Sequence, residues 1–181
     1  MSLKKSSPNL VLIIVMLASF VTPFTISAIN VSLPSIAKEL NLDAVMINWV
    51  QLSFLITAAV LLVPLGKISD VFGRKKVMLL GLAIVGFAGL WCAFAFNGVS
   101  LLVGRIVQAV GSAMLMVAGF AILTSVFPVK QRGKAIGLNV AAVYLGLSLG
   151  PLGGGVLAEF ISWRSLFVVT LPLAFIAFIE L

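Results

Sequence analysis

Long apolar runs separated by short polar stretches make up almost the whole of this sequence. The apolar runs cover roughly residues 10–31, 46–65, 77–96, 99–127, 135–161 and 166–181. Since a helix needs about 20 apolar residues to cross the hydrocarbon of a bilayer, the first five runs are long enough to span it. The pattern predicts an all-α transmembrane fold, a six-helix bundle forming one domain over residues 1–181, with the sixth helix cut short.

Composition excludes a soluble globular domain. The chain is 62% hydrophobic and 9% charged, and its mean hydropathy is +1.27. Its net charge of +7 could suggest a nucleic-acid partner, but the cations lie in short stretches between apolar runs, which is typical of membrane orientation. The sequence has no histidine and one cysteine, and no nucleophile–base pair, metal cluster or phosphate loop is apparent. We therefore expect no enzyme, no metal or other cofactor and no nucleic-acid binding.

The distribution of cations predicts which way the chain faces. With the amino terminus inside, nine cations fall on the cytoplasmic side: Lys4, Lys5, Lys67, Arg74, Lys75, Lys76, Lys130, Arg132 and Lys134. Only Lys38 and Arg164 fall outside, and Arg105 is left within the membrane. Because cytoplasmic loops carry an excess of lysine and arginine, we expect a multi-pass protein of the cell membrane with a cytoplasmic amino terminus.

The stretch from Gly66 to Lys76 carries more than an orientation bias. It places Asp70 four residues before Arg74 and frames the pair with Gly66 and Gly73, which predicts a loop with a tight backbone reversal. These residues resemble the signature loop between the second and third helices of the major facilitator superfamily, with a departure at Val71. The resemblance implies that the Asp70–Arg74 pair is a cytoplasmic latch that stabilises one transport state.

Polar side chains inside the predicted spans mark a second candidate region. Arg105, Gln108 and Ser112 fall on one stripe of their helix, and the stripe resembles a superfamily pattern that implies a cavity-lining arginine for proton coupling or substrate charge. Snorkelling of Arg105 to the headgroups is the alternative interpretation. Further candidates for the same cavity, which could equally form hydrogen bonds between helices, are Thr25, Asn30 and Gln51.

The segment from Asn30 to Ile36 resembles a motif of the 14-span drug/proton antiporters of the superfamily. Those relatives usually carry an aspartate where this chain has Thr25. No Asp or Glu of the first five predicted spans falls within the hydrocarbon, and Thr25 cannot supply the missing charge, so we expect any titrating carboxylate coupled to Arg105 to lie outside this sequence.

Glycines dominate the fifth run. Gly146, Gly150 and Gly154 recur every four residues, which predicts close contact with another helix, and Pro151 predicts a bend. With Gly137 and Gly155 they resemble the superfamily's antiporter motif, which implies export in exchange for protons.

The resemblance implies the amino-terminal half of a major facilitator transporter, built from two three-helix repeats, with a carboxy-terminal half outside this sequence. The implied function is proton-driven efflux of hydrophobic or cationic small molecules, with the lipid bilayer and protons as partners. Two alternatives stay open: an exporter of a metabolite, sugar or tetracycline in the same superfamily, and a membrane scaffold or fragment without transport. The sequence leaves the substrate, the total number of spans and the oligomeric state undetermined.

Overall fold

The structure is a computed structural model that describes residues 7–169, 171 and 172. Every regular element in these residues is a helix. The five long helices are α1 (Pro8–Leu40), α2 (Ala44–Phe72), α3 (Arg74–Ala93), α4 (Gly98–Val126) and α5 (Val129–Phe160), and all five are long and apolar enough to cross a membrane. A further helical segment begins at residue 165, and most of the expected sixth helix lies outside the described residues.

Most helices are longer than their apolar runs. The first was expected to end near residue 31 but continues to Leu40, and the fifth begins at Val129 rather than near residue 135. A cap, and not hydropathy, ends α1: Asn41 stops the helix in the left-handed region at φ 51°, and Asp43 then accepts a hydrogen bond from the first turn of α2. Helix α5 begins directly after Pro128, without a side-chain cap. An apolar run measures only the part of a helix that lies in hydrocarbon.

The prediction of a loop between Gly66 and Lys76 is wrong. Helix α2 continues through Phe72 and α3 begins at Arg74, three residues earlier than expected, so only Gly73 separates them. Gly73 has φ 100° and ψ 126°, a conformation that residues with a side chain rarely adopt, and it alone makes the reversal. Gly66 lies inside the helix, where a Cβ atom would be in ordinary contact, 3.7 Å from Val117.

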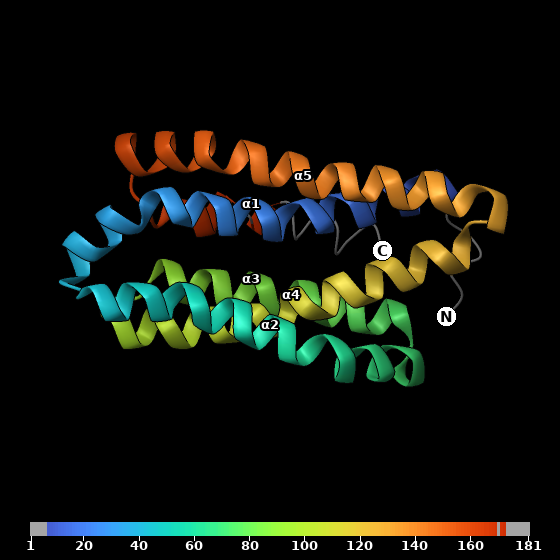
Figure 1. The fold of residues 1–181 in the computed structure, drawn as a ribbon, viewed down its shortest axis with the longest axis horizontal. Coiled ribbons are helices and arrows are strands. Elements are labelled where there is room, and N and C mark those ends of the chain that lie inside the picture. The colour runs from blue at the N-terminus through green and yellow to red at the C-terminus, as the bar shows by residue number, and fades with distance from the viewer. Residues whose placement is uncertain (1–6, 170, 173–181) are drawn as a thin grey trace.

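The helices form two groups (Figure 1). Helices α1 and α5 pack side by side along their length, while α4 packs against both α2 and α3, and α1 also contacts α4. Connections alternate between two ends of the bundle. The "Asp70 end" carries the α2–α3 and α4–α5 connections, and the "Glu39 end" carries the α1–α2 and α3–α4 connections and the turn after α5.

Candidate functional site

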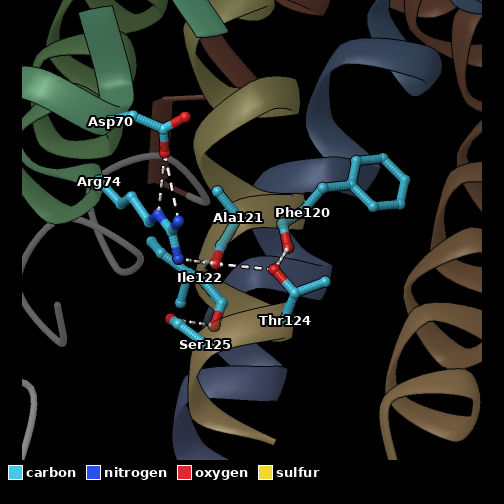
Figure 2. A network of polar contacts seen from close by, with 7 residues as sticks. All are labelled: Asp70, Arg74, Phe120, Ala121, Ile122, Thr124 and Ser125. Atoms are coloured by element: carbon cyan, nitrogen blue, oxygen red, sulfur yellow. Dashed lines mark hydrogen bonds and ion pairs between the residues drawn. The ribbon is translucent and has the colours of Figure 1, made fainter. Parts of the chain in front are cut away.

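The reversal at Gly73 brings Asp70 and Arg74 together on the surface of α4 (Figure 2). Arg74 Nη2 lies 3.2 Å and Nε 3.4 Å from Asp70 Oδ1, and Arg74 Nη1 donates to the carbonyl oxygen of Ala121 at 2.8 Å. Arg74 therefore joins the start of α3 to both α2 and α4. Because the two side chains are 38% and 65% exposed, the ion pair alone is worth about 0.2–1 kcal/mol, and the bond to α4 is the better shielded link.

The segment of α4 that receives Arg74 is rich in side-chain hydrogen bonds to its own backbone. Thr124 Oγ1 lies 3.0 Å from the carbonyl oxygens of both Phe120 and Ala121, and Ser125 Oγ donates to Ile122 at 2.8 Å. Arg74 and Thr124 thus share the Ala121 carbonyl as an acceptor (Figure 2). A cation near the carboxyl end of a helix also interacts favourably with the helix dipole. We did not expect Ala121 or Thr124 from the sequence, because an alanine carbonyl leaves no trace in residue type.

The polar stripe on α4 is buried rather than exposed in the described bundle. Arg105 is 1% exposed, donates from Nη1 to Gln108 Oε1 at 2.6 Å, and stacks its guanidinium 4.2 Å from the centre of the Phe54 ring on α2. Its side chain does not snorkel to the surface. Arg105 and Gln108 lie side by side, as their places on one stripe of the helix indicated, whereas a role of either residue in a cavity stays a prediction.

The remaining interior candidates lie apart from Arg105 or serve their own helix. Thr25 is buried and donates to the Val21 carbonyl at 2.8 Å, so its hydroxyl is used within α1. The Ser112 hydroxyl oxygen instead accepts a hydrogen bond from Thr22 Oγ1 of α1 at 3.2 Å, a contact that we did not predict from the sequence. Two candidates remain without a contact that explains them: Asn30, which is exposed, and Gln51, whose buried Oε1 has no hydrogen-bond partner.

The glycines of α5 form a close seam with α1. A Cβ atom at Gly146 would lie 2.7 Å from the Phe20 carbonyl oxygen, at Gly150 2.6 Å from Ser27 Cβ, and at Gly154 2.6 Å from the Cα atom and carbonyl oxygen of Ala28. These distances are shorter than side-chain carbons tolerate, so the predicted close contact is confirmed. The other two glycines lie outside the seam: Gly137 has nothing within 4 Å, and Gly155 makes ordinary contact.

A serine hydroxyl of α1 replaces the hydrogen-bond donor that is missing where proline interrupts α5. Pro151 has no N–H group, so the carbonyl of Leu147 loses its donor within the helix. Ser27 of α1 donates to this carbonyl at 2.8 Å. Ser32 Oγ lies 3.1 Å from the Ala28 carbonyl of its own helix and 3.4 Å from the Gly154 carbonyl. The two helices are therefore joined by close packing and by the Ser27 hydrogen bond at the position of the break.

A second charged cluster ties the Glu39 end together. Glu39 at the end of α1 accepts from Trp163 Nε1 at 2.6 Å and pairs with Arg164, which also donates from Nη2 to the carbonyl of Ala95 at 3.1 Å. The Arg164 guanidinium stacks 4.4 Å from the Trp163 ring centre. The cluster connects α1, the α3–α4 connection and the turn after α5. We did not predict it, although an acid isolated at the end of an apolar run and an adjacent tryptophan–arginine pair were visible.

Comparison with known proteins places this arrangement among membrane transporters. The family model of the Major Facilitator Superfamily matches residues 15–181. The chain is 32% identical over 168 residues to the riboflavin transporter RibZ of Clostridioides difficile (strain 630), which covers 93% of this chain and 37% of that protein. It is 32% identical over 171 residues to the methylenomycin A resistance protein of Bacillus subtilis (strain 168), covering 94% of this chain and 37% of the relative. The cephamycin export protein CmcT of Amycolatopsis lactamdurans is 33% identical over 171 residues, with coverage of 94% and 35%.

Solved structures match the fold. The proton:xylose symporter XylE, bound to 6-bromo-6-deoxy-D-glucose, superposes with a TM-score of 0.84 at 16% identity, over 95% of this chain and 43% of that one. A bacterial homologue of the human lysosomal transporter Spinster, in an inward-facing and unoccupied conformation, superposes with a TM-score of 0.79 at 22% identity, over 98% and 43%. The predicted all-α transmembrane fold is confirmed, and the chain spans well under half the length of the proteins it matches.

Proposed function

Because this chain belongs to the Major Facilitator Superfamily, we propose that it is part of a secondary active transporter that exports small, largely apolar molecules in exchange for protons. The chain covers 37% of the length of the first two relatives described above, so the activity is proposed for the whole protein. Two relatives are named for resistance or export, which supports the outward direction.

The observation that carries the proposal is the glycine seam between α1 and α5. In an exchanger, protons must cross the membrane only through the site that also binds the substrate. The helix bundle must therefore contain no other path for protons. At Gly150 the two helices are so close that an added Cβ atom would overlap Ser27, and this spacing leaves no room for water between them. The hydrogen bond from Ser27 satisfies the carbonyl freed by Pro151, so this carbonyl does not need a water molecule as its donor. The same glycines carry the resemblance to the antiporter motif.

The charges favour one orientation of this transporter in the cell membrane. Seven cations of the described residues lie at or next to the Asp70 end, namely Lys67, Arg74, Lys75, Lys76, Lys130, Arg132 and Lys134. The Glu39 end has Lys38 and Arg164. We propose that the Asp70 end, and with it the amino terminus, faces the cytoplasm.

The contact of Arg74 with Asp70 and α4 would then act on the cytoplasmic side. It joins three helices through one side chain, so it stabilises the arrangement in which α2, α3 and α4 are packed together at this end. We propose that this contact favours one of the two states between which an alternating-access transporter moves.

The proposal is tested with the full-length protein in proteoliposomes that contain a fluorescent pH indicator. Riboflavin, methylenomycin A and a cephamycin, the compounds named for the relatives, are added in turn, and proton movement is recorded. We expect at least one compound to drive proton exchange, Gly150→Leu to abolish it, and Gly137→Ala to preserve it because nothing lies within 4 Å of that position. If both substitutions have equal and mild effects on proton exchange, the glycines serve only to pack the helices and have no specific role in exchange.

A second candidate is transport of a vitamin or other metabolite, which the 32% identity to the riboflavin transporter favours. The two candidates differ in direction and substrate. Net accumulation of labelled riboflavin in right-side-out vesicles that carry the full-length protein would support this candidate over export.

A further inference from the structure

The corner between α2 and α3 contains a cavity of about 600 Å³. It is lined by the end of α2, the reversal and the start of α3, and its polar lining includes Ser69, Asp70, Arg74, Lys75 and Lys76. Asp70 and Arg74 pair with each other, and among the described residues neither lysine has an ion-pair partner. The lining therefore carries uncompensated positive charge, which an anion would balance.

The first turn of α3 offers backbone donors at the same cavity. Helix α3 follows Gly73 directly, and no described side chain caps its first turn. The N–H group of Val77 donates to the Gly73 carbonyl at 3.1 Å. The three preceding N–H groups, of Arg74, Lys75 and Lys76, have no acceptor within the helix, as at the start of any α-helix. Such N–H groups and the positive end of the helix dipole together favour a bound anion.

A helix start alone does not define a binding site, and Ser69 provides a second, independent indication. A serine inside a helix can donate its hydroxyl to a carbonyl oxygen of the preceding turn, as Ser32 does to Ala28 at 3.1 Å. Ser69 is fully buried and lines the cavity, yet its Oγ has no hydrogen-bond partner among the described residues. Because a buried hydroxyl without a partner costs free energy, this donor indicates a ligand atom that accepts from it.

We propose that this cavity binds the phosphate group of an organic phosphate ester. The phosphate oxygens accept from the N–H groups of the first turn of α3 and from the Ser69 hydroxyl, while Lys75 and Lys76 balance the charge. A carboxylate offers only two oxygens to these converging donors, whereas a phosphate monoester offers three. The cavity is larger than a phosphate group alone requires, so the ester carries an organic part that lies beside Phe72 and Leu79.

Two sources of phosphate ester can reach this end of the bundle. One is a membrane phospholipid, because the cavity lies where two helices of membrane-spanning length meet, and Phe72 in its lining is 67% exposed. The other is a soluble phosphate ester. Binding at this site does not require proton exchange, so failure of either proposal leaves the other standing.

The test compares probes with and without a phosphate group. Dioctanoyl phosphatidylglycerol and dioctanoylglycerol form one pair, and glycerol 3-phosphate and glycerol form the other. All four are titrated by calorimetry against the purified full-length protein in detergent. We expect at least one phosphate-bearing probe to bind at least about tenfold more tightly than its phosphate-free counterpart. Preference for the phosphatidylglycerol alone identifies a lipid site, and preference for glycerol 3-phosphate identifies a site for soluble esters.

Three variants distinguish a specific site from diffuse attraction to the basic Asp70 end. Ser69→Ala removes a donor but no charge, and the double variant Lys75→Gln/Lys76→Gln removes two charges; each should weaken binding by about tenfold. Lys130→Gln/Lys134→Gln is the matched control, because it removes two charges at the same end but outside the lining of the cavity. It should weaken binding by less than about threefold, since exposed charges at a distance are screened.

Thermal unfolding without ligand establishes that each variant is folded. The proposal is overturned if no phosphate-bearing probe binds more tightly than its counterpart, or if Ser69→Ala binds as tightly as the wild type. It is also overturned if the Lys130/Lys134 control weakens binding as much as the Lys75/Lys76 variant, because the attraction would then be diffuse.

Discussion

Replacing Gly154 by alanine should separate α1 from α5. The added Cβ atom would lie 2.6 Å from both the Cα atom and the carbonyl oxygen of Ala28, and 2.9 Å from its Cβ. Non-bonded carbon atoms are normally about 3.5–4.0 Å apart, so the helices must move apart by about 1 Å. Both obstructing atoms belong to the backbone of α1, and no change of rotamer can relieve the contact.

The expected cost is large for the addition of one methyl group. Overpacking of this kind costs about 1–3 kcal/mol, and here it also lengthens the 3.4 Å contact from Ser32 to the Gly154 carbonyl. One kcal/mol shifts the midpoint of thermal unfolding by about 2–4 °C in a domain of 150–250 residues and by less in a longer chain, so the midpoint of the full-length protein should fall by a few degrees. The measurement is the thermal unfolding of the purified full-length protein in detergent, followed by loss of the monodisperse species.

Two glycines of the same helix provide the controls. Gly155→Ala places its Cβ atom 3.9 Å from Val31, and Gly137→Ala meets nothing within 4 Å. Both should be neutral or slightly stabilising, because alanine in a helix is favoured over glycine by up to about 1 kcal/mol. If Gly154→Ala unfolds within a degree of these two variants, the seam is not as close as described and the reasoning is wrong.

Three further predictions follow from the other contacts. Arg74→Ala should reduce export more than Asp70→Asn, because it removes the bond to α4 as well as the ion pair; equal rates in an export assay would contradict this. Ser27→Ala should lower the free energy of unfolding by about 1 kcal/mol in the wild type but have little effect in a Pro151→Ala background, where the helix can supply its own donor; additive effects in this double-mutant cycle would refute this replacement of the donor. Glu39→Gln should lower unfolding stability by about 1 kcal/mol or less, since the ion pair is partly exposed and the amide can still accept from the neighbouring tryptophan; a loss above about 3 kcal/mol would show that the cluster is more tightly coupled than its geometry indicates.

Local spacing accounts for the part of the structure that was predictable. The order and approximate position of the five helices follow from the length of the apolar runs, and the Arg105–Gln108 and Asp70–Arg74 pairs follow from their three- and four-residue separations. Periodic glycines likewise predicted a close seam without naming its partner. Each of these features depends on side chains of recognisable type at helical spacing, which the sequence displays directly.

The missing parts depend on residues that meet only after folding. Arg74 and Ala121 are 47 positions apart, Ser27 and Leu147 are 120 apart, and Trp163 and Glu39 are 124 apart. Two of these contacts end on backbone carbonyls, which every residue has, so no residue type identifies them. The helix ends were missed for a different reason: an apolar run marks only the part of a helix that lies in hydrocarbon, and α1 continues beyond it to its cap at Asn41.

Proton-coupled export requires that accumulation of the exported compound depend on a pH difference across the membrane. Inside-out vesicles that carry the full-length protein would be given an acidic interior, and accumulation of a labelled compound from the panel above would be followed with and without a protonophore. We predict accumulation against the compound's own gradient while the interior is acidic, and complete loss of accumulation when the protonophore collapses the pH difference. Accumulation that is unchanged by the protonophore, or flow only down the compound's gradient, would contradict proton-coupled export.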